Sequence, residues 1–201
     1  DSSASRQPAR PLPSRDPLRI EAVDPENRAV TVRGHFGILH ARRRSRMVRF
    51  IHTSDLQLGR PFAGMPEACA ALLRRARMDA LARVLELACE KEAAFVVIAG
   101  DLFDANTISS DIVAQTCDTL RRAKVEVYAI PGNHDDGGPE SVYRQARMFD
   151  HRPSNLHILL DGAPVRVADT AAVLLPAPLL QRHEHRDVTS HLTRELGADF
   201  A

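Results

Sequence analysis

Three short apolar segments, each followed by polar residues, predict the buried strands of a parallel sheet. They cover residues 50–53, 96–99 and 125–130 and are rich in β-branched and aromatic side chains. A strand that is buried on both faces reads as a nearly continuous apolar run of about this length. We therefore predict three parallel strands, each of which ends at a polar loop.

Two amphipathic segments separate these strands. Both residues 66–92 and residues 111–122 carry apolar side chains at helical spacing, with charged side chains opposite. The alternation of strand and helix predicts an α/β fold built from right-handed βαβ units. The expected inner positions are Leu73, Ala76, Ala80, Leu81, Val84 and Ala88 in the first helix and Ile112, Val113, Thr116 and Leu120 in the second.

The chain after residue 139 predicts a second sheet. A helix is expected near residues 140–149, and short apolar runs follow at residues 156–160, 165–167 and 171–175. Asp161-Gly162 and Asp169 interrupt these runs, as turn residues do. We expect the three runs to form the second sheet of a sandwich.

Residues 1–46 differ in composition from the rest. Residues 1–17 hold four of the thirteen prolines together with Ser and Arg, which predicts disorder. Residues 18–23 and 29–32 flank Asp24-Pro25-Glu26-Asn27 and predict a β-hairpin. Because Met47 immediately precedes the first strand, we expect residues 1–46 to be a disordered or spurious extension. The folded domain is then residues 47–201.

The formal net charge of +1 conceals an uneven distribution. Ten of the 27 basic residues and five of the 26 acidic residues lie in residues 1–46, so this segment carries +5 and residues 47–201 carry −4. An acidic body suits metal ligation and gives no general support for nucleic-acid binding. The run of Arg and Ser at residues 42–46 is more often a solvated tail than a DNA contact.

The composition fits a cytoplasmic globular protein. No run approaches the ~18–20 apolar residues of a membrane span, and residues 1–30 lack the apolar centre of a secretory signal. Cys69, Cys89 and Cys117 are widely spaced in helix-like apolar contexts. We expect all three to be reduced core residues.

Polar residues at the three strand ends are candidate metal ligands. Asp55, Asp101 and the pair Asn133 and His134 each follow one strand. Ligands of open α/β sheets bind at the carboxyl ends of the strands, so we predict that these residues are neighbours. A two-metal hydrolytic site needs hard oxygen ligands, a bridging group and a proton donor.

Each residue type has an expected role in such a site. Gly100 permits a tight turn that lets Asp101 bridge two cations. Asp55 would hold the first ion, and Asn133 would offer an amide oxygen to the second. His134 is the candidate acid or transition-state stabiliser. Asp, Asn and His ligands suit Mn²⁺, Fe²⁺ or Zn²⁺.

These motifs resemble those of the calcineurin-like metallophosphoesterase superfamily. Residues 52–59, Gly100-Asp101-Leu102-Phe103-Asp104 and Gly132-Asn133-His134-Asp135 are similar to the nuclease subunit of the bacterial SbcCD complex and its relatives. The resemblance covers roughly residues 47–180. It implies an α-β-β-α sandwich of two mixed sheets flanked by helices, with the carboxyl-terminal part missing, and a centre of two divalent cations, expected to be Mn²⁺.

The chain departs from this family pattern at two points. Gln57 stands where the family has a histidine two residues after its first aspartate. On an extended segment its side chain would point to the same side as Asp55, so Gln57 is a candidate ligand through a weak amide oxygen. Alternatively, it contacts substrate or is only a polar loop residue. The family's later Gly-His-x-His motif does not occur.

Three further residues are candidates for holding a metal ligand in place or for contacting substrate. His52 either positions a phosphate or is a packed strand histidine, and Asp104 either supports a ligand or caps the following turn. Asp135, next to His134, belongs to the same group. His183 and His185 flank Glu184 but face apart on a polar stretch, so we expect no metal site there.

We expect a metal-dependent phosphodiester hydrolase, and specifically a DNA repair exonuclease. DNA and, by resemblance, an ATPase subunit of the SbcC type are its expected partners, with no membrane contact; a homodimer is left open. Two alternatives stand. One is a small-molecule phosphodiesterase or phosphatase on the same fold, since fold does not dictate substrate. The other is a degenerate, non-catalytic subunit that binds DNA or a partner, which Gln57 makes plausible.

Overall fold

The structure, a computed structural model, describes residues 19–23, 29–34, 37–42 and 47–192. The chain divides into two compact units, Asp1–Ser45 and Arg46–Ala201.

The first unit contains a three-stranded antiparallel sheet. Strand β1 (Arg19–Val23) pairs with β2 (Ala29–Gly34), which agrees with the predicted hairpin. Strand β3 (Gly37–Arg42) then pairs with β2 and was not predicted. Residues 1–17, expected to be disordered, lie outside the described residues. That residues 1–46 take no part in the catalytic fold stays a prediction.

Deleting residues 1–46 is expected to leave the melting temperature of the remaining domain nearly unchanged. The strands of this segment pair with one another, and its Pro-rich and Arg-rich composition offers little apolar surface for burial. Thermal unfolding of the truncated and full chains, followed by circular dichroism, measures the difference. A fall of more than a few degrees would show that the segment stabilises the second unit.

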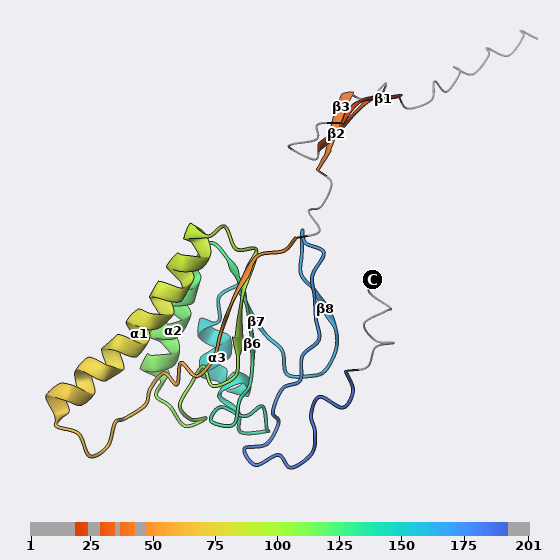
Figure 1. Cartoon of the computed structure of the whole chain (residues 1–201). Helices are drawn as coiled ribbons and strands as arrows, with labels where there is room; N and C mark the ends of the chain where they lie inside the picture. The colour runs from red at the N-terminus through yellow and green to blue at the C-terminus, as the bar shows by residue number, and fades with distance from the viewer. Residues whose placement is uncertain (1–18, 24–28, 35–36, 43–46, 193–201) are drawn as a thin grey trace, which may run out of the picture. The chain divides into compact units, whose positions relative to one another are not determined.

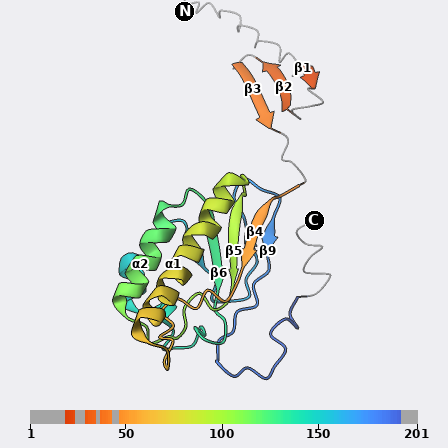
Figure 2. The same ribbon diagram turned by 60° about the vertical axis from the view of Figure 1, so that its left-hand side comes forward.

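The second unit is built on a four-stranded parallel sheet. Its strand order is β4-β5-β6-β7. Helix α1 (Glu67–Glu90) follows β4, and helix α2 (Ser110–Arg122) follows β5. Both helices cover the same face of the sheet (Figure 2). The four strands are Phe50–Thr53, Phe95–Ala99, Glu126–Ile130 and Leu156–Ile158. This arrangement confirms the predicted α/β class.

The apolar run at residues 156–160 does not belong to the second sheet, contrary to the prediction. Strand β7 instead belongs to the four-stranded parallel sheet, where it pairs with β6, and Leu156 is in register with Val127. The side-chain amide of Asn155 donates to the carbonyls of Leu120, Ala123 and Val125, which fixes the start of β7 beside β6. A short apolar run carries no local mark of the sheet that it joins.

The second sheet is present but small. Strands β8 (Val165–Arg166) and β9 (Val173–Leu174) pair antiparallel. Val167 packs with Phe95 and Tyr128 of the parallel sheet, so β8 and β9 lie on the face away from α1 and α2 (Figure 1). The predicted helix near residues 140–149 is split into a 3₁₀ turn, η1 (Val142–Arg144), and helix α3 (Ala146–His151).

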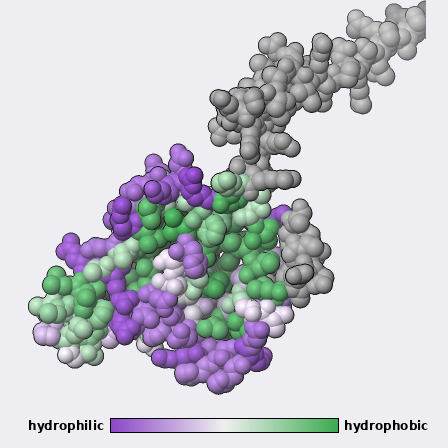
Figure 3. Space-filling model, in the orientation of Figure 1, coloured by the Kyte–Doolittle hydropathy of each residue, from purple (hydrophilic) through white to green (hydrophobic). Residues whose placement is uncertain are grey.

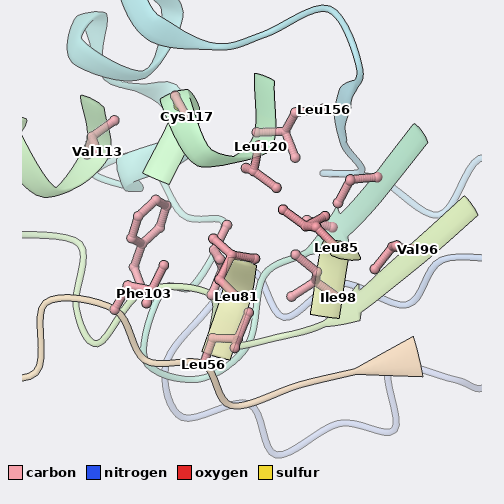
Figure 4. Packing of buried hydrophobic residues seen from close by; sticks show 14 of the residues in the cluster. Leu56, Leu81, Leu85, Val96, Ile98, Phe103, Val113, Cys117, Leu120 and Leu156 are labelled. Carbon is pink, nitrogen blue, oxygen red and sulfur yellow. The ribbon is translucent and has the colours of Figure 1, made fainter. Parts of the chain in front are cut away.

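The main core lies between the parallel sheet and the two long helices (Figure 4). Val96 and Ile98 of β5 face Leu81 and Leu85 of α1, and Leu120 of α2 completes the contact. Full burial of such an aliphatic side chain contributes about 1.5–3 kcal/mol. Of the other predicted inner positions of α2, Val113 and Thr116 are buried and Ile112 is half-buried.

The first half of α1 departs from the predicted pattern. Leu73 and Ala76 are exposed, and Leu72 is 69% exposed, because this part of the helix projects beyond the sheet (Figure 1). Ala80 is also exposed, although the next residue, Leu81, is buried. Apolar surface is visible at this end of the molecule (Figure 3). The cysteine prediction is also wrong in part, since Cys117 is buried but Cys69 and Cys89 of α1 are exposed. Helical periodicity identifies a face but does not show how far the sheet beneath it extends.

Among the described residues, no helix is both long and apolar enough to span a membrane.

Candidate metal centre

The loops after β4 and β5 run side by side, held by backbone hydrogen bonds. The N–H of Asp55 donates to the carbonyl of Gly100 at 3.2 Å, and the N–H of Gln57 donates to the carbonyl of Asp101 at 2.8 Å. Leu58 continues the pairing with Leu102 at 2.9 Å. The two loops therefore extend the sheet past its strand ends, and Asp55 and Asp101 lie on adjacent segments.

Asp101 is the point where the loops after β5 and β6 meet. It is only 6% exposed, and its Oδ1 accepts the backbone N–H of His134 at 2.9 Å. A Cβ at Gly132 would lie 2.1 Å from this oxygen, so only glycine fits there. The structure thus brings Asp101 and His134 together, as the strand-end argument predicts.

Asp135 accepts hydrogen bonds from both of these loops. Its Oδ1 accepts the N–H groups of Gly132 at 2.8 Å and Asp101 at 3.2 Å. Its Oδ2 accepts the N–H of Phe103 at 3.0 Å and the hydroxyl of Tyr143. The carboxyl group is fully buried and accepts four hydrogen bonds from three segments of the chain. Asp135 therefore sets the shape of the loops that carry Asp101 and His134.

Burial controls the protonation of this buried pair. Loss of water raises the pKa of Asp135, and the hydrogen bonds from Tyr143, Gly132 and Phe103 oppose that rise. Burial, together with the charge of Asp135, raises the pKa of Tyr143 well above its usual value. Tyr143 is therefore a hydrogen-bond donor.

Asp104 positions the ring of His134. The Nδ1 atom of His134 lies 2.9 Å from the carbonyl oxygen of Asp104 and 3.7 Å from its Oδ1. Because a carbonyl oxygen only accepts, Nδ1 carries the proton in this contact. Nε2 is then the ring nitrogen left for contact with a substrate. Asp104 orients the histidine mainly through its backbone.

The other candidate ligands lie nearer the surface. Asp55 is exposed, and its Oδ2 accepts the Ser54 hydroxyl at 2.5 Å. Gln57 is half-buried, and its Oε1 accepts from Nη1 of Arg60 at 2.5 Å. Asn133 is exposed on the loop after β6. These side chains therefore border the same edge as the buried Asp101.

Backbone strain is concentrated in these loops. Asp55, Gln57 and Asp101 have φ values of 57°, 43° and 55°, in the left-handed region that non-glycine residues rarely adopt. Such conformations cost about 1–3 kcal/mol each and gather at functional sites. Three of the predicted ligands thus share an unusual backbone conformation that the surrounding hydrogen bonds maintain.

The comparison with known families agrees with the motifs at these loops. The family model described as calcineurin-like phosphoesterase matches residues 48–190. The chain belongs to this family.

Three curated relatives are similar to parts of this phosphoesterase. The uncharacterized metallophosphoesterase YhaO of Bacillus subtilis is 31% identical over 121 residues, covering 57% of this chain and 28% of the relative. The DNA double-strand break repair protein Mre11 of Archaeoglobus fulgidus is 32% identical over 91 residues, covering 44% and 19%. The protein of the same name from Nanoarchaeum equitans is 31% identical over 108 residues, covering 52% and 27%. The chain spans less than a third of the length of each relative.

The donor set of this phosphoesterase fits a divalent cation through oxygen. Backbone hydrogen bonds place the segment of Asp55 and Gln57 beside Asp101, and Asn133 precedes His134, whose N–H donates to Asp101. Calcineurin-like phosphoesterases use divalent metal ions. Hard oxygen donors of this kind suit Mg²⁺ or Mn²⁺. Among the described residues, no group of three or more His, Cys, Asp or Glu side chains is arranged to hold a metal ion. A cation at this edge would therefore need further ligands to complete its coordination.

His52 is the candidate that the structure does not bring into these loops. It lies on β4 itself, in register with Val97, and therefore shares the sheet face of Phe95 and Tyr128. Two residues that the sequence did not indicate do belong to the site. They are Tyr143, which holds Asp135, and Arg60, which holds Gln57. The position of Arg60 three residues after Gln57 gives a weak indication in the sequence that the two side chains meet. Nothing in the sequence indicates that Tyr143 contacts Asp135.

Proposed function

We propose that this phosphoesterase is part of a metal-dependent phosphodiester hydrolase that acts on DNA as a repair exonuclease. The observation that carries the proposal is the linkage of three strand-end loops around Asp101, with His134 held beside it. Two of the similar proteins are named for the repair of DNA double-strand breaks, which supports DNA as the substrate. The similarity to YhaO is of the same size, so the substrate requires a direct test.

The residues divide into ligands and an acid. Asp101 would bridge two divalent cations, with Asp55 on the first and Asn133 on the second, and we propose Mn²⁺ for both. When bound, such ions polarise the phosphate and lower the pKa of a bound water. As an imidazolium, His134 would donate from Nδ1 to the carbonyl of Asp104 and give its Nε2 proton to the leaving sugar oxygen. Asp135 and Asp104 hold these groups in place.

The free cysteines support a proposal for the cellular compartment. Cys69, Cys89 and Cys117 are free thiols, which fits a reducing compartment, and we propose the cytoplasm. An ATPase subunit of the SbcC type is the proposed partner.

The full-length protein should degrade end-labelled DNA in the presence of Mn²⁺, and a chelator should stop the reaction. Bis(p-nitrophenyl) phosphate serves as the small phosphodiester for comparison. Cleavage of the small ester without cleavage of DNA would replace the nuclease with a small-molecule phosphodiesterase. Hydrolysis of neither substrate with Mn²⁺, Fe²⁺ or Zn²⁺ would indicate a subunit that only binds.

A further inference from the structure

Arg60 presents a guanidinium group at the edge of the candidate metal centre. Its Nη1 donates to Gln57 Oε1 at 2.5 Å and lies 3.9 Å from Asp104 Oδ1. The side chain is 44% exposed. Among the residues that the structure describes, both polar contacts of this guanidinium use Nη1. Its remaining N–H groups therefore stay available to a ligand.

Arg60 and His134 share one neighbour. The Oδ1 atom of Asp104 lies 3.9 Å from Nη1 of Arg60 and 3.7 Å from Nδ1 of His134. The guanidinium and the imidazole therefore flank the same carboxylate oxygen. Arg60 and His134 thus place a guanidinium and an imidazole at the same edge of the site.

The loop after β4 is built to hold Arg60 in this position. Phe62 has a φ of 54°, and the guanidinium carbons of Arg60 and Arg77 lie 5.9 Å and 5.4 Å from the centre of its ring. Arg77 donates to the carbonyls of Asp55 and Leu56 and so fixes the loop itself. Arg77 therefore has a structural role, whereas Arg60 faces the site edge.

We propose that Arg60 binds the phosphate that is hydrolysed and that Gln57 anchors its guanidinium. A guanidinium offers parallel N–H donors that match two phosphate oxygens, and the charge strengthens both bonds. A neutral amide oxygen at position 57 accepts from Arg60, whereas an imidazole whose nitrogen ligates a metal could not. At the position where the resemblance implies a histidine, Gln57 thus holds the cationic side chain of Arg60 for phosphate binding. This inference rests on the proposed function and specifies how that site recognises its substrate.

The test measures binding of inorganic phosphate to the full-length protein loaded with Mn²⁺, by calorimetry. Arg60→Gln should weaken phosphate binding about ten-fold, as expected for the loss of a charge-assisted contact, and Arg60→Lys should weaken it less. Mn²⁺ affinity, titrated separately, should not change. The matched control is Arg75→Gln on α1, whose side chain is 82% exposed beside Asp79, and it should leave phosphate binding unchanged.

A second variant separates the two roles of Gln57. Gln57→Ala leaves Arg60 in place without its anchor, so phosphate binding should weaken several-fold while Mn²⁺ affinity is kept. A fall in Mn²⁺ affinity for Gln57→Ala would make Gln57 a metal ligand and overturn the proposal. Unchanged phosphate binding in Arg60→Gln would overturn it equally. Arg60→Lys, which retains the charge, provides the folded comparison if Arg60→Gln unfolds.

The phosphate-binding test and the nuclease assay can fail independently of each other. If wild-type protein binds phosphate through Arg60 but does not cut DNA, the nuclease proposal fails and the Arg60 assignment stands. If wild-type protein cuts DNA and Arg60→Gln has the same KM and phosphate affinity, only the Arg60 assignment fails.

Discussion

Replacing His134 with Asn in the full-length protein is expected to lower phosphodiester hydrolysis by about 10²–10⁴-fold, the usual contribution of an acid or base group. The backbone N–H of residue 134 still donates to Asp101 Oδ1, so the loop should keep its shape. The amide of Asn can donate to the carbonyl of Asp104 in place of Nδ1 but cannot transfer a proton. In this variant the rate of DNA cleavage should therefore fall, whereas calorimetry should show unchanged Mn²⁺ binding.

Asp101→Asn provides the contrast. Loss of the bridging carboxylate should remove Mn²⁺ binding together with hydrolysis, because an amide cannot bridge two cations as a carboxylate does. If both variants bound two Mn²⁺ ions normally, the bridging role of Asp101 would be wrong. If His134→Asn kept full activity, the proton donor would have to be another group.

Asp135→Ala is expected to lower the free energy of unfolding by about 3–5 kcal/mol, among the largest effects of a single substitution. It leaves the N–H groups of Gly132, Asp101 and Phe103, and the Tyr143 hydroxyl, without their buried acceptor. Tyr143→Phe removes only one of these donors and should cost about 1–2 kcal/mol. Urea denaturation followed by circular dichroism measures both differences.

The control for this prediction is an exposed carboxylate. Asp118→Ala on α2 removes a surface partner of Arg121 and should change stability by less than about 1 kcal/mol. A similar small loss for Asp135→Ala would mean that water replaces the carboxylate and that the loops do not depend on it.

The sequence alone determined the order of the main elements and the edge at which the site lies. Strands at residues 50–53, 96–99 and 125–130 and the two long helices were visible from local periodicity, because each depends on residues close together in the chain. The position at which each strand ends also depends on residues close together in the chain. Parallel strands place their carboxyl ends together, and this rule located Asp101 and His134 before any distance was known.

Only the tertiary structure decided the contacts that shape the site. The four donors to Asp135 come from three segments, and Asp101 and Asp135, which are 34 positions apart, carry no local signal of their hydrogen bond. The same holds for Tyr143 and for the contact of Arg60 with Asp104. These contacts depend on how loops pack once the sheet has formed, since side-chain hydrogen bonds require positions within a few tenths of an ångström. Local periodicity specifies the faces of strands and helices but not distances between loops.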